Sequence, residues 1–126
     1  MAESDLTVLL RTMEPVLFPE PYGYAVWDGP LPFAAYATVA EEEGLTVVAP
    51  LAAMQAAGVA SDPWARISLT VHSDLAAVGL TAAFAGALGR VGISCNVIAG
   101  VHHDHLFVQW DRRKAAMAAL RELSRA

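Results

Sequence analysis

The sequence predicts an α+β fold made of two tandem lobes with antiparallel sheets, and three observations lead to this prediction. The charge and the proline content change sharply near "VASDPWAR". The second half of the chain follows a regular order of strand and helix patterns. The first half repeats the end of that order in "EGLTVVAPLAAMQAAG". A chain of 126 residues is long enough for one ordinary domain or for two small lobes that share a core.

Composition places the boundary between the lobes. From Met1 to Asp62 the chain has nine acidic residues and one basic residue, whereas the remainder has four acidic and seven basic residues. All seven prolines lie in the first 63 residues. We therefore expect the boundary at the Asp62-Pro63 turn, with lobes of residues 1–62 and 63–126. The uneven charge has two explanations: attraction between the halves, within or between chains, or uneven solvation of two faces.

The second half opens with a strand that leads into a helix. The segment "ARISLTVH" alternates apolar and polar residues, as a half-buried strand does: Ile67, Leu69 and Val71 face one way and Arg66, Ser68, Thr70 and His72 face the other. Ser73 suits an N-cap, and Asp74 suits the positive end of a helix. The helix is expected from Leu75 to Gly89, with Leu80, Phe84 and Leu88 as its core stripe and Gly92 just beyond its end.

A hairpin and a last helix complete this half. Ile93–Ile98 is the next predicted strand, Gly100–His103 is a turn, and "DHLFVQW" is a third strand that pairs antiparallel. Leu106, Val108 and Trp110 share one face of this strand, and His105, Phe107 and Gln109 share the other. Asp111 is the predicted cap of a helix that runs to about Leu123. The order strand, helix, strand, strand, helix is that of the ferredoxin-like βαββαβ fold without its final strand.

The first half is a degenerate version of the same lobe. The segment "YGYAVWDG" predicts a strand, and the proline-rich link "PLPF" stands where a helix would otherwise lie. A hairpin is expected in "AAYATVAEEEGLTVVAP", with its turn at Glu43-Gly44, and a short helix follows in "LAAMQAAG". Leu6–Met13 predicts a further helix. The segment "EPVLF" is expected to add the missing strand to the other lobe.

Bulk properties exclude several classes of protein. Cys95 is the only cysteine, so an internal disulfide is impossible. The longest uncharged run, Leu75–Gly89, is too short to cross a bilayer, and the acidic N-terminus lacks the basic start of a signal peptide. We therefore expect a cytoplasmic protein without membrane contact. The net charge of −5 argues against nucleic acid as a partner. A 56% hydrophobic content with few surface charges favours a homo-oligomer, most simply a dimer.

Three segments between residues 67 and 108 form a specific combination: "LTVHSDLAAVGLTA", "GISCNVIAG" and "HHDHLFV". In this combination the stretch resembles a family of small bacterial proteins built as tandem ACT domains. ACT domains are ferredoxin-like modules that bind small molecules, usually amino acids, at lobe or subunit interfaces. They commonly regulate attached enzymes. The resemblance therefore implies a free-standing, non-catalytic sensor that binds an amino acid and acts on an unidentified partner protein.

The resemblance also implies where the ligand binds. In ACT domains the turn from the first strand to the helix and the start of the second strand frame the ligand. In this sequence those positions are Ser73, Asp74, Gly79, Leu80 and Asn96. The alternative for Ser73 and Asp74 is that they only cap the helix, and the alternative for Asn96 is a cross-strand hydrogen bond.

Elementary chemistry adds two residues to this candidate site. A free amino acid needs donors for its carboxylate, which backbone amides at a helix start supply. Its ammonium needs an acceptor, which Asp74, Asp104 or the Asn96 side chain provides. His105, at the rim of the hairpin, is expected to line the same pocket, and the alternative is that the imidazoles of this turn bond neighbouring backbone. His103 and His105 would make binding depend on pH.

The histidines of "GVHHDH" raise a second hypothesis. His103 and His105 are two residues apart on a strand, so they share a face, and with His72 they are a candidate metal site of a metal-binding protein or metal-dependent enzyme. No second cluster of ligands supports this site, and Ser73 is too close in sequence to His72 to indicate a catalytic triad. We therefore expect no cofactor and no catalysis. A third hypothesis is a docking or oligomerisation module without any ligand.

Overall fold

The chain folds into two compact units, which are described separately below. The computed structural model describes residues 5–71 and 74–125. The larger unit comprises the described residues of Met1–Phe18 and Ala65–Ala126, and the smaller unit comprises Pro19–Trp64. The first residues of the chain thus fold with its second half. The predicted division by sequence order, into residues 1–62 and 63–126, stays a prediction.

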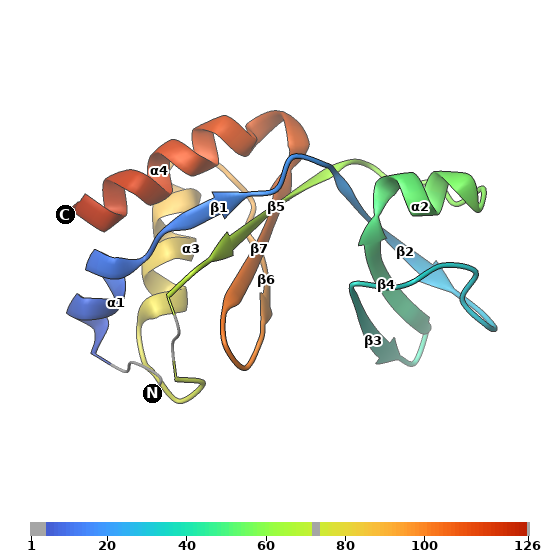
Figure 1. Cartoon of the computed structure of the whole chain (residues 1–126), viewed down its shortest axis with the longest axis horizontal. Helices are drawn as coiled ribbons and strands as arrows, with labels where there is room; N and C mark the ends of the chain where they lie inside the picture. The colour runs from blue at the N-terminus through green and yellow to red at the C-terminus, as the bar shows by residue number, and fades with distance from the viewer. Residues whose placement is uncertain (1–4, 72–73, 126) are drawn as a thin grey trace. The chain divides into compact units, whose positions relative to one another are not determined.

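The larger unit contains a four-stranded antiparallel sheet in the ferredoxin-like order (Figure 1). Its strands, in spatial order, are β1 (Pro15–Leu17), β5 (Trp64–Leu69), β7 (Asp104–Gln109) and β6 (Asn96–Ala99). Its helices are α1 (Leu6–Thr12), α3 (Leu80–Arg90) and α4 (Arg113–Arg125), with a 3-10 turn, η1 (Trp110–Arg112), before α4. The order strand, helix, strand, strand, helix that the sequence predicts is confirmed.

The fourth strand of this sheet comes from the N-terminal segment, as expected for "EPVLF". Strand β1 pairs antiparallel with β5, and Pro15 lies opposite Leu69. Two further backbone hydrogen bonds extend the pairing, from Phe18 N–H to the Arg66 carbonyl at 2.9 Å and from Thr70 N–H to the Glu14 carbonyl at 3.1 Å. The Arg66 guanidinium also stacks 3.8 Å above the Phe18 ring. The N-terminal segment is therefore integral to the larger unit.

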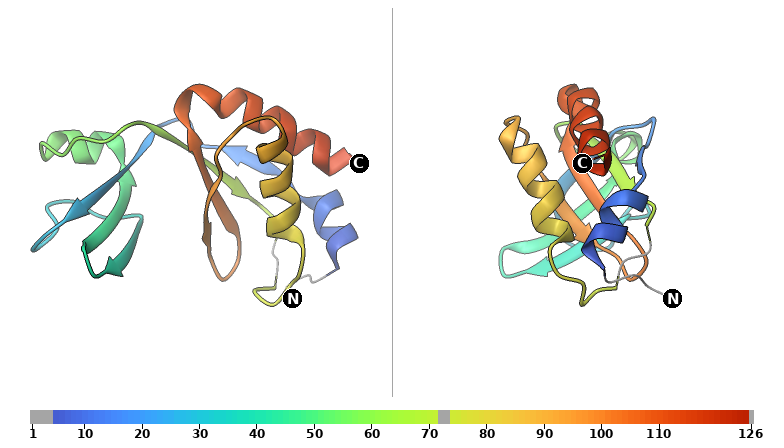
Figure 2. Two further views of the ribbon diagram at one scale, coloured as in Figure 1. Left: turned by 180° about the vertical axis from the view of Figure 1, so that it is seen from behind. Right: turned by 90° about the vertical axis from the view of Figure 1, so that its left-hand side faces the viewer.

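Helices α1, α3 and α4 share one hydrophobic core with the sheet (Figure 2). The fully buried side chains of this core come from every helix and from the two central strands: Leu9, Met13, Ile67, Leu69, Phe84, Leu88, Leu106, Val108 and Leu120. Side chains alternate across a strand, so the even-numbered residues of β7 face the helices and the odd-numbered residues face away. This alternation determines which of the predicted site residues can meet.

Helix α3 begins later than the sequence predicts. It starts at Leu80 rather than Leu75, and its N-cap is Gly79, whose φ of +100° is in the left-handed region. The predicted start of the helix is therefore wrong. Asp74 precedes the helix, and its Oδ1 accepts a hydrogen bond from Ala76 N–H at 2.8 Å within a turn; Ser73 lies outside the described residues. The left-handed Gly79 is the physical reason, because helical φ and ψ cannot extend through it.

The end of α3 agrees with prediction. Gly92, at a φ of +75°, follows the C-cap residue Val91. Ile93 N–H donates to the Leu88 carbonyl and Gly92 N–H donates to the Gly89 carbonyl, both at 3.0 Å. These two bonds form a Schellman motif, which satisfies carbonyls that the last helical turn leaves open.

The predicted cap of α4 is wrong. Strand β7 ends at Gln109, and the chain enters η1 at once, so Asp111 lies inside the 3-10 turn and Gln109 occupies the N-cap position. Trp110 consequently leaves the strand face on which it was predicted. The Arg113 guanidinium lies 4.0 Å from the centre of the Trp110 ring and donates to the Trp110 carbonyl at 2.7 Å.

The smaller unit has the degenerate form that the sequence predicts. Its strands lie in the order β3 (Ala37–Glu41), β4 (Gly44–Pro50), β2 (Tyr22–Trp27), and its helix is α2 (Leu51–Ala56). The link between β2 and β3 is non-helical, and the Trp27 indole donates to the Pro30 carbonyl at 3.0 Å within it. The hairpin turn is one residue earlier than predicted: Glu41 pairs with Gly44, so Glu42 and Glu43 form the loop. Val47, Ala49 and Met54 form its buried core.

Within the part of the chain that the structure describes, no helix is both long enough and apolar enough to cross a bilayer.

Candidate functional site

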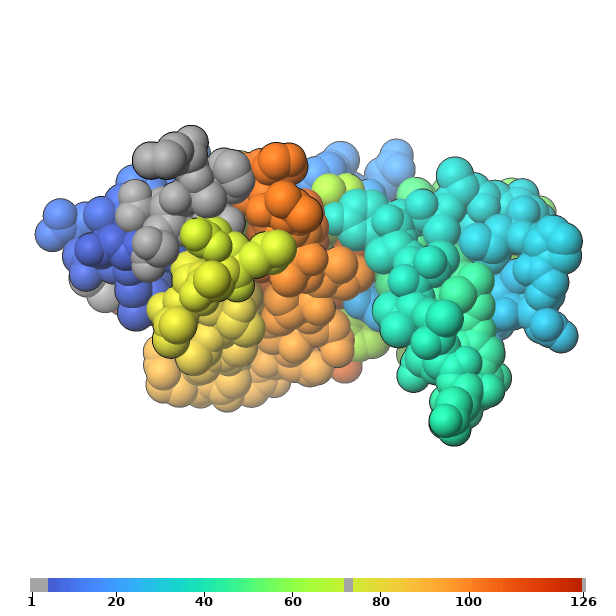
Figure 3. Space-filling view, turned by 90° about the horizontal axis from the view of Figure 1, so that it is seen from below, coloured from blue at the N-terminus to red at the C-terminus, as the bar shows by residue number. Residues whose placement is uncertain are grey.

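A small pocket lies at the loop between β5 and α3 of the larger unit. Its volume is about 80 Å³. The residues that line it come from the loop, the first turn of α3, and the facing ends of β6 and β7: Asp74, Leu75, Ala77, Leu80, Thr81, Ala99 and Asp104. In the space-filling view the segment that contains the loop (yellow) lies directly beside the β6–β7 hairpin (orange) (Figure 3). Segments far apart in sequence therefore build one pocket.

Two carboxylates contribute to this pocket. Asp104 is the first residue of β7 and is only 9% exposed. It shares the face of β7 that carries Leu106 and Val108, which points it toward the helices. Asp74 approaches from the loop, held by its bond to Ala76 N–H. Two acidic side chains at one small pocket favour a cationic group such as an ammonium.

The start of α3 supplies the opposite electrostatic character. Leu80 and Thr81, its first two residues, line the pocket. The N-cap Gly79 has no side-chain oxygen, so it cannot accept a hydrogen bond from the first-turn N–H groups as Ser or Asp would. A helix start carries partial positive charge and attracts anions such as carboxylates. The pocket thus combines acceptors for a cation with a helix terminus that favours an anion.

Three of the predicted site residues meet here, and one supports the site indirectly. Asp74, Leu80 and Asp104 all line the pocket. Gly79 provides the left-handed turn that ends the loop, and a β-carbon at this position would lie 2.9 Å from a methyl group of Leu6. The close approach predicted at Gly79 is therefore to a side chain of α1. Ser73 lies outside the described residues.

Asn96 and His105 lie away from this pocket. Asn96 is at the other end of β6 from Ala99, is exposed, and its Nδ2 donates to the Phe107 carbonyl at 3.4 Å. This is the cross-strand bond that was the alternative for Asn96. His105 follows Asp104 on β7 and so faces the opposite side of the sheet. There its Nδ1 lies 2.7 Å from the Oγ of Ser68, which is buried.

Burial is the main reason that the pKa of His105 is lowered from its ordinary value of 6.5. Electrostatic interactions with Arg66 and then His103 lower the pKa of His105 further. His105 is therefore mostly neutral at neutral pH, and its Nδ1 can either donate a hydrogen bond to the Ser68 hydroxyl or accept one from it, depending on the tautomer.

The structure does not assemble the predicted histidine metal site from the residues that it describes. The His103 Nδ1 lies 3.3 Å from the Val71 carbonyl, and His105 is engaged with Ser68. His72 lies outside the described residues. Among residues 5–71 and 74–125, no three His, Cys, Asp or Glu side chains are grouped closely enough to hold a metal ion.

Sequence reasoning missed Leu75, Ala77, Thr81 and Ala99 as lining residues. The signal for Ala99 was present, because the predicted turn at Gly100–His103 places Ala99 opposite Asp104, and the structure pairs these two residues. Thr81 could have been identified only with the correct start of α3, because it lies in the first turn of that helix.

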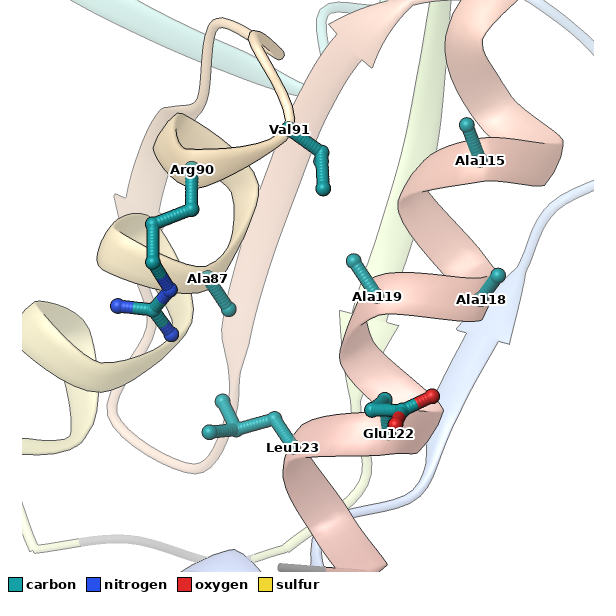
Figure 4. Close-up of a pocket in the computed structure, with 8 residues that line it drawn as sticks. All are labelled: Ala87, Arg90, Val91, Ala115, Ala118, Ala119, Glu122 and Leu123. Carbon is teal, nitrogen blue, oxygen red and sulfur yellow. The ribbon is translucent and has the colours of Figure 1, made fainter.

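A larger and more apolar hollow lies on the surface between α3 and α4 (Figure 4). This α3–α4 groove has a volume of about 510 Å³. Its lining consists of small or aliphatic residues with one basic and one acidic side chain: Ala87, Arg90, Val91, Ala115, Ala118, Ala119, Glu122 and Leu123. It lacks the paired carboxylates of the smaller pocket.

Comparison with known proteins agrees with the fold. Residues 1–66 match one family model described as an ACT domain, and residues 59–122 match a second model with the same description. A Vibrio cholerae protein of unknown function, described as a possible transport protein, is 44% identical in sequence; the match covers 94% of this chain and 95% of that one, with a TM-score of 0.84. No curated protein matches the chain.

More distant structures share the fold alone. A protein from Agrobacterium tumefaciens is 17% identical over 89% of each chain, with a TM-score of 0.75. The ligand-free regulatory subunit of aspartate kinase from Thermus thermophilus is 11% identical, over 90% of this chain and 97% of that subunit, with a TM-score of 0.65.

Proposed function

The chain belongs to the ACT-domain family, with two ACT domains in tandem, and from this membership we propose that it is a non-catalytic regulatory module that binds a free amino acid. The ligand site is the pocket between the β5–α3 loop and the β6–β7 hairpin. The likeness to a regulatory subunit of aspartate kinase supports a regulatory role, with an unidentified protein as the regulated partner.

One observation carries this proposal: two carboxylates and the first turn of a helix line the same pocket. Asp74 and Asp104 accept hydrogen bonds from an ammonium, while the first turn of α3 at Leu80 and Thr81 favours a carboxylate. An α-amino acid carries both groups on adjacent atoms. A simple cation would leave the helix terminus unused, and a simple anion would be repelled by the two aspartates.

The size of the pocket limits what enters it. Its volume of about 80 Å³ holds roughly five water-sized groups. The nitrogen, the α-carbon and the three carboxylate atoms of an amino acid fill this space, so the amino-acid side chain lies outside. Leu75 and Ala77, which line the pocket from the loop, are placed to contact a ligand side chain of modest size.

Thermal-shift screening against the common amino acids tests this function. For a single site on the folded state, ligand at about ten times its Kd adds ~1.4 kcal/mol of stability, which raises Tm by roughly 5 °C for a domain of this size. Asp74→Asn and Asp104→Asn should each remove most of the shift. Asp111→Asn, an exposed carboxylate in η1, is the matched control and should keep it.

Chemical analogues and a chelator sharpen the test. The N-acetyl derivative of the active amino acid lacks the ammonium and should give no shift, and the corresponding amine lacks the carboxylate and should give a smaller one. A chelator should leave the response unchanged. A screen in which no amino acid raises Tm, or a response that both aspartate variants retain in full, would exclude this site.

A further inference from the structure

We propose that the α3–α4 groove is a docking site for a second copy of this chain, which forms a two-fold symmetric dimer through α3 and α4. The groove lies entirely within the larger unit. Its apolar lining, its pair of opposite charges and the uncharged surface of α3 together point to this occupant.

The surface of α3 lacks the charges of an ordinary exposed helix. Of its eleven residues, Leu80–Arg90, only the last is charged. Its exposed positions include Thr81, Ala82 and Gly89, none of which is charged. A surface helix of a globular protein normally carries charged residues opposite its core stripe. An exposed helical face without them is typical of a surface that another protein covers.

The groove beside this face continues the apolar surface. Val91 is 49% exposed, at the end of α3. Ala115 and Ala118 are exposed on α4, and Ala119 and Leu123 are half-buried next to them (Figure 4). Side chains this small let another helix approach closely, so that its ridge of residues fits between α3 and α4.

The charges of the groove are complementary to those of a second copy. Arg90 lies on the α3 wall and Glu122 on the α4 wall, both exposed (Figure 4). In a two-fold interface each contact occurs twice with the roles of the copies exchanged. Arg90 of one copy then meets Glu122 of the other, and the same pair forms again by symmetry. A partner of one charge sign would attract one of these residues and repel the other.

Helix α4 itself has the surface that fills such a groove. Ala115, Ala118 and Glu122 follow one another at spacings of three and four residues, so they lie along one exposed stripe. With this stripe in the groove of the opposite copy, small side chains meet the apolar lining and Glu122 reaches Arg90. The groove adjoins the end of α3 opposite the ligand pocket, so this inference does not depend on the proposed function.

Sedimentation equilibrium of the full chain tests the proposal. The wild-type protein should be a dimer across the micromolar range. Arg90→Glu and Glu122→Arg each place like charges opposite each other, twice per dimer, and should raise the dimer Kd by about tenfold or more. The double variant restores opposite charges with the roles exchanged, so its Kd should return toward that of the wild type.

A bulky charge in the lining provides a second measurement. Ala118→Arg should abolish the dimer without unfolding the monomer, because Ala118 is exposed. Ala56→Arg, at an exposed position of α2, is the matched control and should leave the dimer unchanged. A monomeric wild-type protein would overturn the proposal, as would a dimer that Ala118→Arg and both single charge reversals leave intact.

Discussion

Two glycines, one at the N-cap of α3 and one inside this helix, lead to opposite predictions for the same substitution. Gly79 has a φ of +100°, and a β-carbon there would lie 2.9 Å from the Cδ2 of Leu6. Gly89 is helical, and a β-carbon there would have no neighbouring atom within 4 Å. Gly79→Ala should therefore strain the turn that ends the pocket loop, whereas Gly89→Ala should only favour the helix.

The magnitudes follow from these geometries. A non-glycine residue in a disfavoured backbone region costs about 1–3 kcal/mol. The Leu6 methyl group is the end of a flexible side chain, so its displacement adds little. Alanine in place of glycine inside a helix adds about 0.5–1 kcal/mol of stability. The two variants should thus differ by roughly 1.5–4 kcal/mol in free energy of unfolding.

Urea unfolding followed by far-UV circular dichroism measures both variants against the wild type. The midpoint should fall for Gly79→Ala and rise for Gly89→Ala, with unchanged slopes. Gly79→Ala should also weaken the amino-acid response, because the loop would lose the turn that places Leu80 and Thr81 at the pocket. Equal stability of Gly79→Ala and the wild type would refute the left-handed cap and with it the start of α3.

Three further predictions concern the larger unit. Burial raises the pKa of the Cys95 thiol from 9.0 to about 11. At pH 8 the thiol should therefore react with a disulfide reagent about a hundredfold more slowly in the native chain than in the urea-unfolded chain. Equal reaction rates would contradict this prediction. The lowered pKa of His105 means that the unfolded state binds a proton more readily, so stability should be complete above about pH 6.5 and fall as the pH drops below it. His105→Gln should flatten that dependence in urea midpoints measured from pH 5 to 7.5, and an unchanged slope would assign it to other groups. Leu120→Ala truncates a fully buried side chain and should lower the free energy of unfolding by about 2–5 kcal/mol in the same assay. A decrease below about 1 kcal/mol would mean that α4 is not packed on this core.

The elements that the sequence predicted best are those whose signals are local. The alternation in "DHLFVQW" predicted β7, and Gly92 after an apolar helical stripe predicted the Schellman motif. The predicted start of α3 was wrong because residues 75–78 are apolar and compatible with a helix. The left-handed turn that excludes them packs against Leu6, which is 73 positions earlier in the chain, so no local pattern reports it.

The candidate site was predicted in part for a related reason. Chemical reasoning selects residue types that suit a ligand, but it does not say which face of a strand each residue occupies. Asp104 and His105 were assigned to one pocket although neighbours on a strand point to opposite faces, and the structure separates them accordingly. The predicted strand already contained the information needed to separate them. That Asp74 and Asp104 line one pocket, in contrast, depends on how the β5–α3 loop folds back onto the hairpin.

We propose that one pocket holds both charged groups of an amino acid. An NMR titration of the ¹⁵N-labelled chain with the amino acid that gives the largest thermal shift locates the bound ligand on the chain. We expect saturable shifts of the backbone amides of Asp74, Ala77, Leu80, Thr81 and Asp104, and much smaller shifts at Asn96 and on α2. Saturable binding whose shifts leave these five amides unmoved would contradict it.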